Sequence, residues 1–128
     1  MSYEDKVAEN KMVAKKCLEM KAYNAGVTRA YYSAFLRIKA YLKRNQFDYN
    51  LFIQNFPRER EYSHGTLQAA ITKCLSENGK TLIDICNVRV LSNLYEKRRR
   101  ADYESGNIIE DELKASLKDL DTVLSIVA

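Results

Sequence analysis

The residues best suited to chemistry lie together in the segment 94–104, with the sequence LYEKRRRADYE. If this segment is helical, Arg98 and Asp102 are one turn apart, and so are Arg99 and Tyr103. An arginine next to a phenol can hold a phosphate while the ring stacks on a base or a ribose. The simpler alternative is an ion pair within the helix, in which Asp102 only holds Arg98. The sequence of this segment alone does not distinguish a phosphate-binding site from an ion pair within the helix.

A second set of candidate residues lies on the polar side of a predicted helix over 23–44. Arg29, Tyr32, Ser33 and Leu36 share one strip of this helix, which places an arginine next to a phenol. Such a strip is either a solvated cation–π pair or a binding surface that a second basic segment completes.

We hypothesise that the two segments form one cleft for RNA or a nucleotide. The arginines would hold phosphate and the tyrosines would stack or form hydrogen bonds. Asp102 would orient an arginine and would not transfer a proton, because an ordinary carboxylate is ionised at neutral pH. The predicted ligand-binding residues are Arg29, Tyr32, Arg98, Arg99, Asp102 and Tyr103.

Several kinds of site find no support in the composition. His64 is the only histidine, so no histidine pair can bind a metal, and Cys17, Cys74 and Cys86 are too far apart for a zinc site. With four glycines, the chain contains neither a P-loop nor a dinucleotide-binding fingerprint. We therefore expect no metal and no cofactor, and reduced cysteines that serve in packing.

Apolar residues recur at helical spacing in five segments, which predicts an all-α, mostly up-and-down bundle of about five helices. The predicted helices cover about 3–20, 23–44, 63–78, 81–102 and 107–128. The core face of the second helix is expected to consist of Val27, Ala30, Tyr31, Ala34, Ile38, Tyr41 and Leu42.

Three local features accompany these helices. Leu82, Ile85 and Cys86 are expected to face inward on the fourth helix, and Asn107 with Glu110 has the form of a capping box for the fifth. The connection 46–62 holds the only proline and several aromatic residues, so we expect it to pack on the bundle or on a partner.

Length and composition indicate one helical domain over residues 1–128. The N-terminus lacks an apolar signal region, and no apolar run approaches eighteen residues, so we expect a cytoplasmic protein that does not enter a membrane. Six basic and no acidic residues lie between Glu19 and Asp48, whereas residues 101–128 carry seven acids and two lysines. This polarity favours an anionic partner, and opposed basic and acidic surfaces could also mate in a homodimer.

Three motifs occur in the order that a known family displays. They are Arg29-Ala30-Tyr31-Tyr32 with Phe35, then Ser63-His64-Gly65, then Arg99-Arg100-Ala101-Asp102-Tyr103. Together they resemble the HEPN superfamily, and in particular its small stand-alone bacterial and archaeal group. The resemblance implies an all-α bundle, frequent homodimers, and a role in toxin–antitoxin or defence systems, often beside a minimal nucleotidyltransferase partner.

The sequence also departs from the family pattern. HEPN ribonucleases resemble one another in an arginine followed, after four to six residues, by a histidine near the start of the last core helix. No histidine lies near Arg98 to Arg100, and Asp102 occupies that neighbourhood instead. Arg58 and His64 meet the bare spacing, but they fall in the connection before the third predicted helix.

Three functions therefore remain as hypotheses. The first is a HEPN-like module that binds RNA, a nucleotide or a partner protein. The second is a metal-independent ribonuclease toxin with an altered active centre, in which His64, Arg99 and Asp102 cooperate across a dimer. The third is a purely structural helical dimer.

Overall fold

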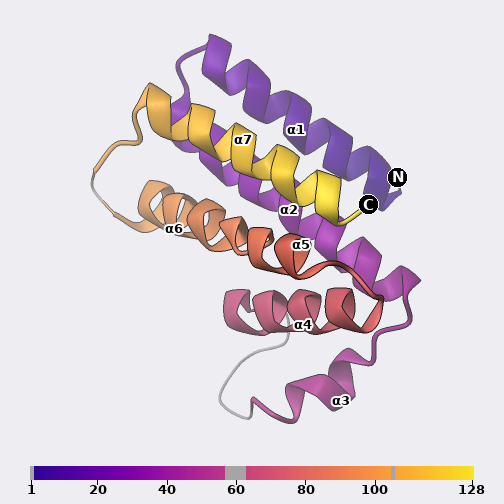
Figure 1. The fold of residues 1–128 in the computed structure, drawn as a ribbon. Helices are drawn as coiled ribbons and strands as arrows, with labels where there is room; N and C mark the ends of the chain where they lie inside the picture. Colours follow the sequence, from indigo (N-terminus) through magenta and orange to yellow (C-terminus); the bar gives the residue numbers. More distant parts are fainter. Residues whose placement is uncertain (1, 57–62, 105) are drawn as a thin grey trace.

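The computed structural model describes residues 2–56, 63–104 and 106–128, and in these ranges it contains helices and no strands (Figure 1). The helices are α1 (Tyr3–Glu19), α2 (Tyr23–Arg44), α3 (Tyr49–Ile53), α4 (His64–Glu77), α5 (Leu82–Asn87), α6 (Val90–Tyr103) and α7 (Glu110–Ile126). The prediction of an all-α bundle is confirmed. Within the described ranges, none of the helices combines the length and the apolar character needed to cross a lipid bilayer.

Helix α2 lies at the centre of the bundle and packs on α1, α6 and α7, while α4 contacts its C-terminal half (Figure 1). All seven residues predicted for its core face are buried. Helices α3 and α4 extend the bundle beyond this end of α2 (Figure 1). Residues far apart in the sequence, on α2 and α6, therefore lie side by side.

The predicted fourth helix is wrong in one respect, because the structure divides it into α5 and α6. Arg89 and Leu91 donate backbone hydrogen bonds to residues three positions earlier, which tightens the chain around the fully buried Val88. Ile85 and Leu91 are six residues apart, so a straight helix would point them in different directions. The break lets Val88 and Leu91 reach the core.

The helix break leaves part of α5 outside the core. Leu82 and Cys86, which were predicted to face inward, are exposed, and Ile85 is half-buried. The side chain of Ile83 is exposed as well. Within α5, Ile85 packs against the core, whereas Leu82 and Cys86 face solvent, so the apolar pattern overstated how much of this short helix is buried.

The connection after α2 contains a helix that the sequence analysis did not predict. Asp48 caps α3 by accepting a hydrogen bond from the backbone of Leu51, and Tyr49 is buried. Phe47 and Phe52 pack against the core, so the described part of this connection lies on the bundle, as expected. Pro57, Arg58 and the other residues of 57–62 lie outside the described residues.

The start of α7 also differs from the prediction. The helix begins at Glu110, and the side chain of Glu112 accepts a hydrogen bond from the backbone of Ile109 at 3.2 Å. Asn107 does not cap the helix, because its side-chain oxygen accepts a hydrogen bond from Asn24 on α2. The predicted apolar stripe of α7 is nevertheless confirmed, since Leu113 and Leu120 are fully buried.

Three helices end in the same hydrogen-bonding motif, with one residue in the left-handed conformation. These residues are Lys21 (φ 59°), Gln46 (φ 55°) and Gly79 (φ 75°). In each case the next residue donates to a carbonyl five positions earlier, in the pairs Ala22–Cys17, Phe47–Leu42 and Lys80–Leu75. Only glycine adopts this conformation without a steric cost.

We therefore expect Gln46→Gly to raise the free energy of unfolding by ~0.5–1 kcal/mol and Gly79→Ala to lower it by ~1 kcal/mol. A Cβ atom at Gly79 meets no atom within 4 Å, so the loss would report backbone conformation alone. Urea denaturation measures both changes. Gln46→Ala is the matched control and should change little, because alanine retains the Cβ; an equal gain in this control would contradict the explanation.

Candidate functional site

The side chain of Arg98 lies among three phenols that come from two helices. Its guanidinium carbon is 5.7 Å from the ring centre of Tyr31, 5.6 Å from that of Tyr32 and 5.7 Å from that of Tyr103. These distances are within the range of cation–π contacts. The guanidinium Nε also lies 3.0 Å from a carboxylate oxygen of Asp102, one turn further along α6. We call these five residues the Arg98 cluster.

Asp102 connects the two helices of the cluster. One of its carboxylate oxygens accepts a hydrogen bond from the hydroxyl of Thr28 on α2, at 3.0 Å. The carboxylate therefore accepts a hydrogen bond from Thr28 and forms an ion pair with Arg98, although the buried Nε atom is not aligned for a hydrogen bond. This geometry agrees with the expectation that Asp102 orients an arginine.

Protonation states in the cluster follow from its partial burial. Burial opposes the charge on Arg98, but the phenols of Tyr32 and Tyr103 and the carboxylate of Asp102 outweigh this effect and raise the pKa of Arg98. Burial raises the pKa of Tyr31 to about 12, so its phenol is neutral at physiological pH. The cluster thus places a cation beside the neutral phenol of Tyr31.

His64 is joined to the cluster through aromatic rings. Its imidazole stacks on Tyr95 of α6 at a centroid distance of 4.1 Å and an angle of 5°, and Tyr95 lies 5.7 Å from Tyr31. The Nε2 atom is 3.4 Å from the hydroxyl of Ser92, and the buried Nδ1 atom has no hydrogen-bond partner. Burial lowers the pKa of His64, which favours the neutral imidazole.

The structure does not bring Arg29 or Arg99 into the cluster. Arg29 donates a hydrogen bond to the side chain of Asn10 on α1 at 3.2 Å, and Arg99 pairs with exposed Glu104 at 3.4 Å. The strip predicted on α2 divides between two neighbours, because Tyr32 points toward α6 whereas Ser33 donates to the backbone of Val7 on α1. One cleft that contains all six predicted residues is therefore not formed within the chain.

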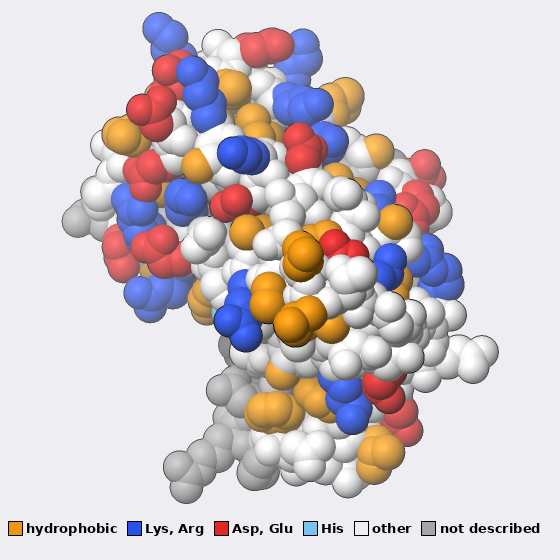
Figure 2. All heavy atoms as spheres, in the orientation of Figure 1, with side chains coloured by type: hydrophobic (Ala, Val, Ile, Leu, Met, Phe, Trp, Pro, Cys, Tyr) orange, Lys and Arg blue, Asp and Glu red, His pale blue; other side chains and the backbone are white. Residues whose placement is uncertain are grey.

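Many basic side chains make contacts within the chain. Arg37 donates to the backbone carbonyls of Leu124 and Val127 near the end of α7, where a cation also complements the helix dipole. Arg100 forms two hydrogen bonds with Glu112 at the start of α7, at 2.5 and 3.4 Å. On the face in Figure 2, basic and acidic side chains are correspondingly interspersed.

Three residues of the site were missed in the sequence analysis. Thr28, Tyr31 and Tyr95 supply the hydroxyl for Asp102 and the rings between Arg98 and His64. Thr28 lies four residues before Tyr32, so a search for polar neighbours one turn away would have found it. Tyr31 was assigned to the core alone, although its ring also contacts the cation. Within the described residues, no three His, Cys, Asp or Glu side chains are grouped to hold a metal ion.

No protein-family model matches the sequence, and a search of curated proteins finds no match either.

The lowered pKa of His64 predicts a pH-dependent stability. The unfolded chain binds a proton at this residue near the ordinary value of 6.5, whereas the folded chain does so only at lower pH. Stability from the neutral imidazole is thus present above pH 6.5 and is lost as pH falls below it. His64→Phe retains an aromatic ring on Tyr95 and should flatten the pH dependence of the free energy of unfolding between pH 5 and pH 7, measured by urea denaturation. An unchanged slope would contradict the assignment.

Proposed function

We propose that the chain is a HEPN-like module that binds single-stranded RNA through the Arg98 cluster. The observation that carries the proposal is the guanidinium of Arg98, which forms an ion pair with Asp102 and lies among three phenols. Among the described residues, its Nη1 atom has no hydrogen-bond acceptor, and Nη2 has only the hydroxyl of Tyr32 at 3.4 Å. The remaining donors suit a phosphate oxygen.

The phenols supply a surface for bases. The side chain of Tyr103 is 73% exposed and that of Tyr32 is 40% exposed, so both can receive a base from solvent. Stacking on an aromatic ring tolerates any base and suits single strands, whose bases are accessible. Arg99, at the exposed side of α6, could neutralise a further phosphate by leaving Glu104.

RNA cleavage is a second candidate function, and the environment of His64 favours it. A neutral imidazole can accept a proton from a ribose hydroxyl, and the Nε2 atom of His64, 3.4 Å from the hydroxyl of Ser92, is the candidate because Nδ1 is buried. Asp102 already pairs with Arg98 and accepts a hydrogen bond from Thr28, so we assign it a positioning role. Metal-independent cleavage by the purified protein that is lost in His64→Gln would establish this function.

The family resemblance extends the proposal to partners. It supports a homodimer, and a toxin–antitoxin or defence system in which the chain pairs with a minimal nucleotidyltransferase. Sedimentation at micromolar concentration should give twice the chain mass of 14.8 kDa. A sedimentation mass equal to that of one chain would exclude the homodimer, and it would also exclude the hypothesis of a purely structural dimer.

Replacing Arg98 should weaken RNA binding while the fold is kept. We expect Arg98→Ala to cost ~1–3 kcal/mol of binding free energy, because a charge-assisted contact to phosphate is lost. Tyr103→Ala should cost a similar ~1–3 kcal/mol through lost stacking. Fluorescence anisotropy with a labelled single-stranded RNA measures both, and circular dichroism checks the helices.

Lys16→Gln is the matched control, because it removes one positive charge on α1, where Lys16 pairs with Glu19. It should change the binding free energy by less than ~0.5 kcal/mol. Equal losses in Lys16→Gln and Arg98→Ala would indicate a diffuse electrostatic effect. Variants that lose stability but bind RNA normally would exclude the Arg98 cluster as the RNA site.

A further inference from the structure

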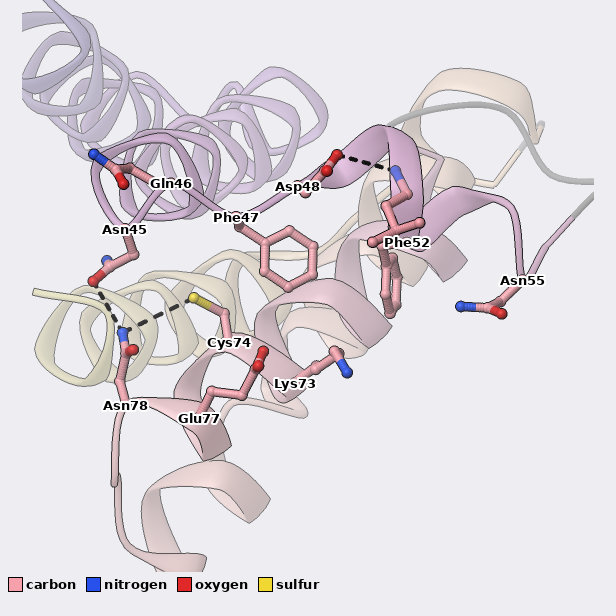
Figure 3. Close-up of a pocket in the computed structure, with 11 residues that line it drawn as sticks. Asn45, Gln46, Phe47, Asp48, Phe52, Asn55, Lys73, Cys74, Glu77 and Asn78 are labelled. Atoms are coloured by element: carbon pink, nitrogen blue, oxygen red, sulfur yellow. Dashed lines mark hydrogen bonds between the residues drawn. The ribbon is translucent and has the colours of Figure 1, made fainter.

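A pocket lies between the C-terminal end of α2, the short helix α3 and the C-terminal half of α4 (Figure 3). Its volume of about 440 Å³ is within the range of small-molecule sites. The pocket starts at Asn45, more than three helical turns beyond Tyr32, and shares no residue with the Arg98 cluster. Its function can therefore be argued separately from RNA binding.

One side of the pocket is apolar. The rings of Phe47 and Phe52 point into it, with centroids 5.3 Å apart at an angle of 63° (Figure 3). Both rings are half-buried against the core, and the thiol of Cys74, only 3% exposed, lies beside them. The apolar side can accept a ring or a branched alkyl group.

The rim of the pocket is held by hydrogen bonds. The side-chain nitrogen of Asn78 donates to the hydroxyl of Tyr41 at 2.7 Å and to the side-chain oxygen of Asn45 at 3.0 Å. These bonds join the C-terminal ends of α4 and α2. The space between the two helix ends is consequently formed before any ligand arrives.

Two opposite charges face this space from α4. Lys73 and Glu77 are exposed and one turn apart, and neither forms an ion pair with a described residue (Figure 3). In a helix, an ion pair at a spacing of four residues is weaker when the lysine precedes the glutamate than when the glutamate precedes the lysine. The carboxylate of Asp48, by contrast, accepts a hydrogen bond from the backbone of Leu51 at 3.1 Å.

We propose that this pocket binds a free α-amino acid with an aromatic or branched apolar side chain. Lys73 would bind the carboxylate of the ligand and Glu77 its ammonium group, while the side chain lies against Phe47 and Phe52. A separate cation and anion beside an apolar wall match a zwitterion. A nucleotide fits less well, because its phosphate would face the carboxylates of Asp48 and Glu77 with a single lysine to offset them.

The test uses L-phenylalanine, phenylethylamine, which lacks the carboxylate, and 3-phenylpropionate, which lacks the ammonium group. Calorimetric titration should detect saturable binding of L-phenylalanine, with each analogue bound roughly tenfold or more weakly.

Two variants locate the charges without disturbing the core, since both residues are exposed. Lys73→Met and Glu77→Gln should each weaken L-phenylalanine binding roughly tenfold or more. Lys114→Met, which removes a lysine that pairs with Glu110 on α7, is the control and should bind normally.

Several results would overturn the proposal. They are no saturation by L-phenylalanine at millimolar concentration, equal affinity for all three compounds, or saturable calorimetric binding of adenosine in the absence of any binding of L-phenylalanine. RNA binding by the same samples is measured in parallel. Because Lys73→Met and Glu77→Gln leave the Arg98 cluster intact, failure of either proposal is recognised independently of the other.

Discussion

The close packing of α2 against its neighbours is the constraint on which the rest of the structure depends. A Cβ atom on Gly26 would lie 2.6 and 2.8 Å from the methyl carbons of Leu113 and 3.1 Å from the Cβ atom of Cys17, so α1, α2 and α7 approach closely at this point. Ala30 and Ala34 continue the small, fully buried surface. Because α2 has helices on several sides, polar residues at its margins become contacts between helices. This explains why neighbouring positions such as Tyr32 and Ser33 have different partners.

The Arg98 cluster owes its geometry to that packing more than to the strength of its ion pair. The side chains of Arg98 and Asp102 are 20% and 32% exposed, and a partly solvated pair of this kind contributes at most about 1 kcal/mol to stability. Its main physical effect is orientation. Thr28 donates a hydrogen bond to the carboxylate, the carboxylate lies 3.0 Å from the guanidinium Nε, and the phenol rings lie around the guanidinium. Because these side chains already contact one another, ligand binding to this surface would cost the protein little side-chain conformational entropy.

Much of the fold could be predicted from the sequence because apolar spacing reports burial directly. The core face of α2 and the stripe of α7 are cases in which one period persists over several turns. Prediction failed at Val88, where the helical spacing of apolar residues is interrupted and α5 ends. It also failed at Asn107 and Asp48, where single side-chain hydrogen bonds determine where a helix begins. Of the predicted site residues, the structure brings Tyr32, Arg98, Asp102 and Tyr103 together between α2 and α6. It places Arg29 against α1 instead, because a helical strip does not specify which adjacent helix each residue meets.

For the proposed binding of nucleic acid, the distribution of paired charges limits the kind of ligand that would fit the Arg98 cluster. The net charge of +4 suggests a basic protein, yet Arg37 caps α7 and Arg100 binds Glu112, so these cations are engaged within the fold. Tracking a duplex requires a row of arginines and lysines against successive phosphates. The cluster instead offers one oriented guanidinium beside exposed phenols. In the proposed function, such a surface would bind through stacking together with one or two phosphate contacts; single-stranded RNA offers both, whereas a continuous duplex keeps its bases stacked inside.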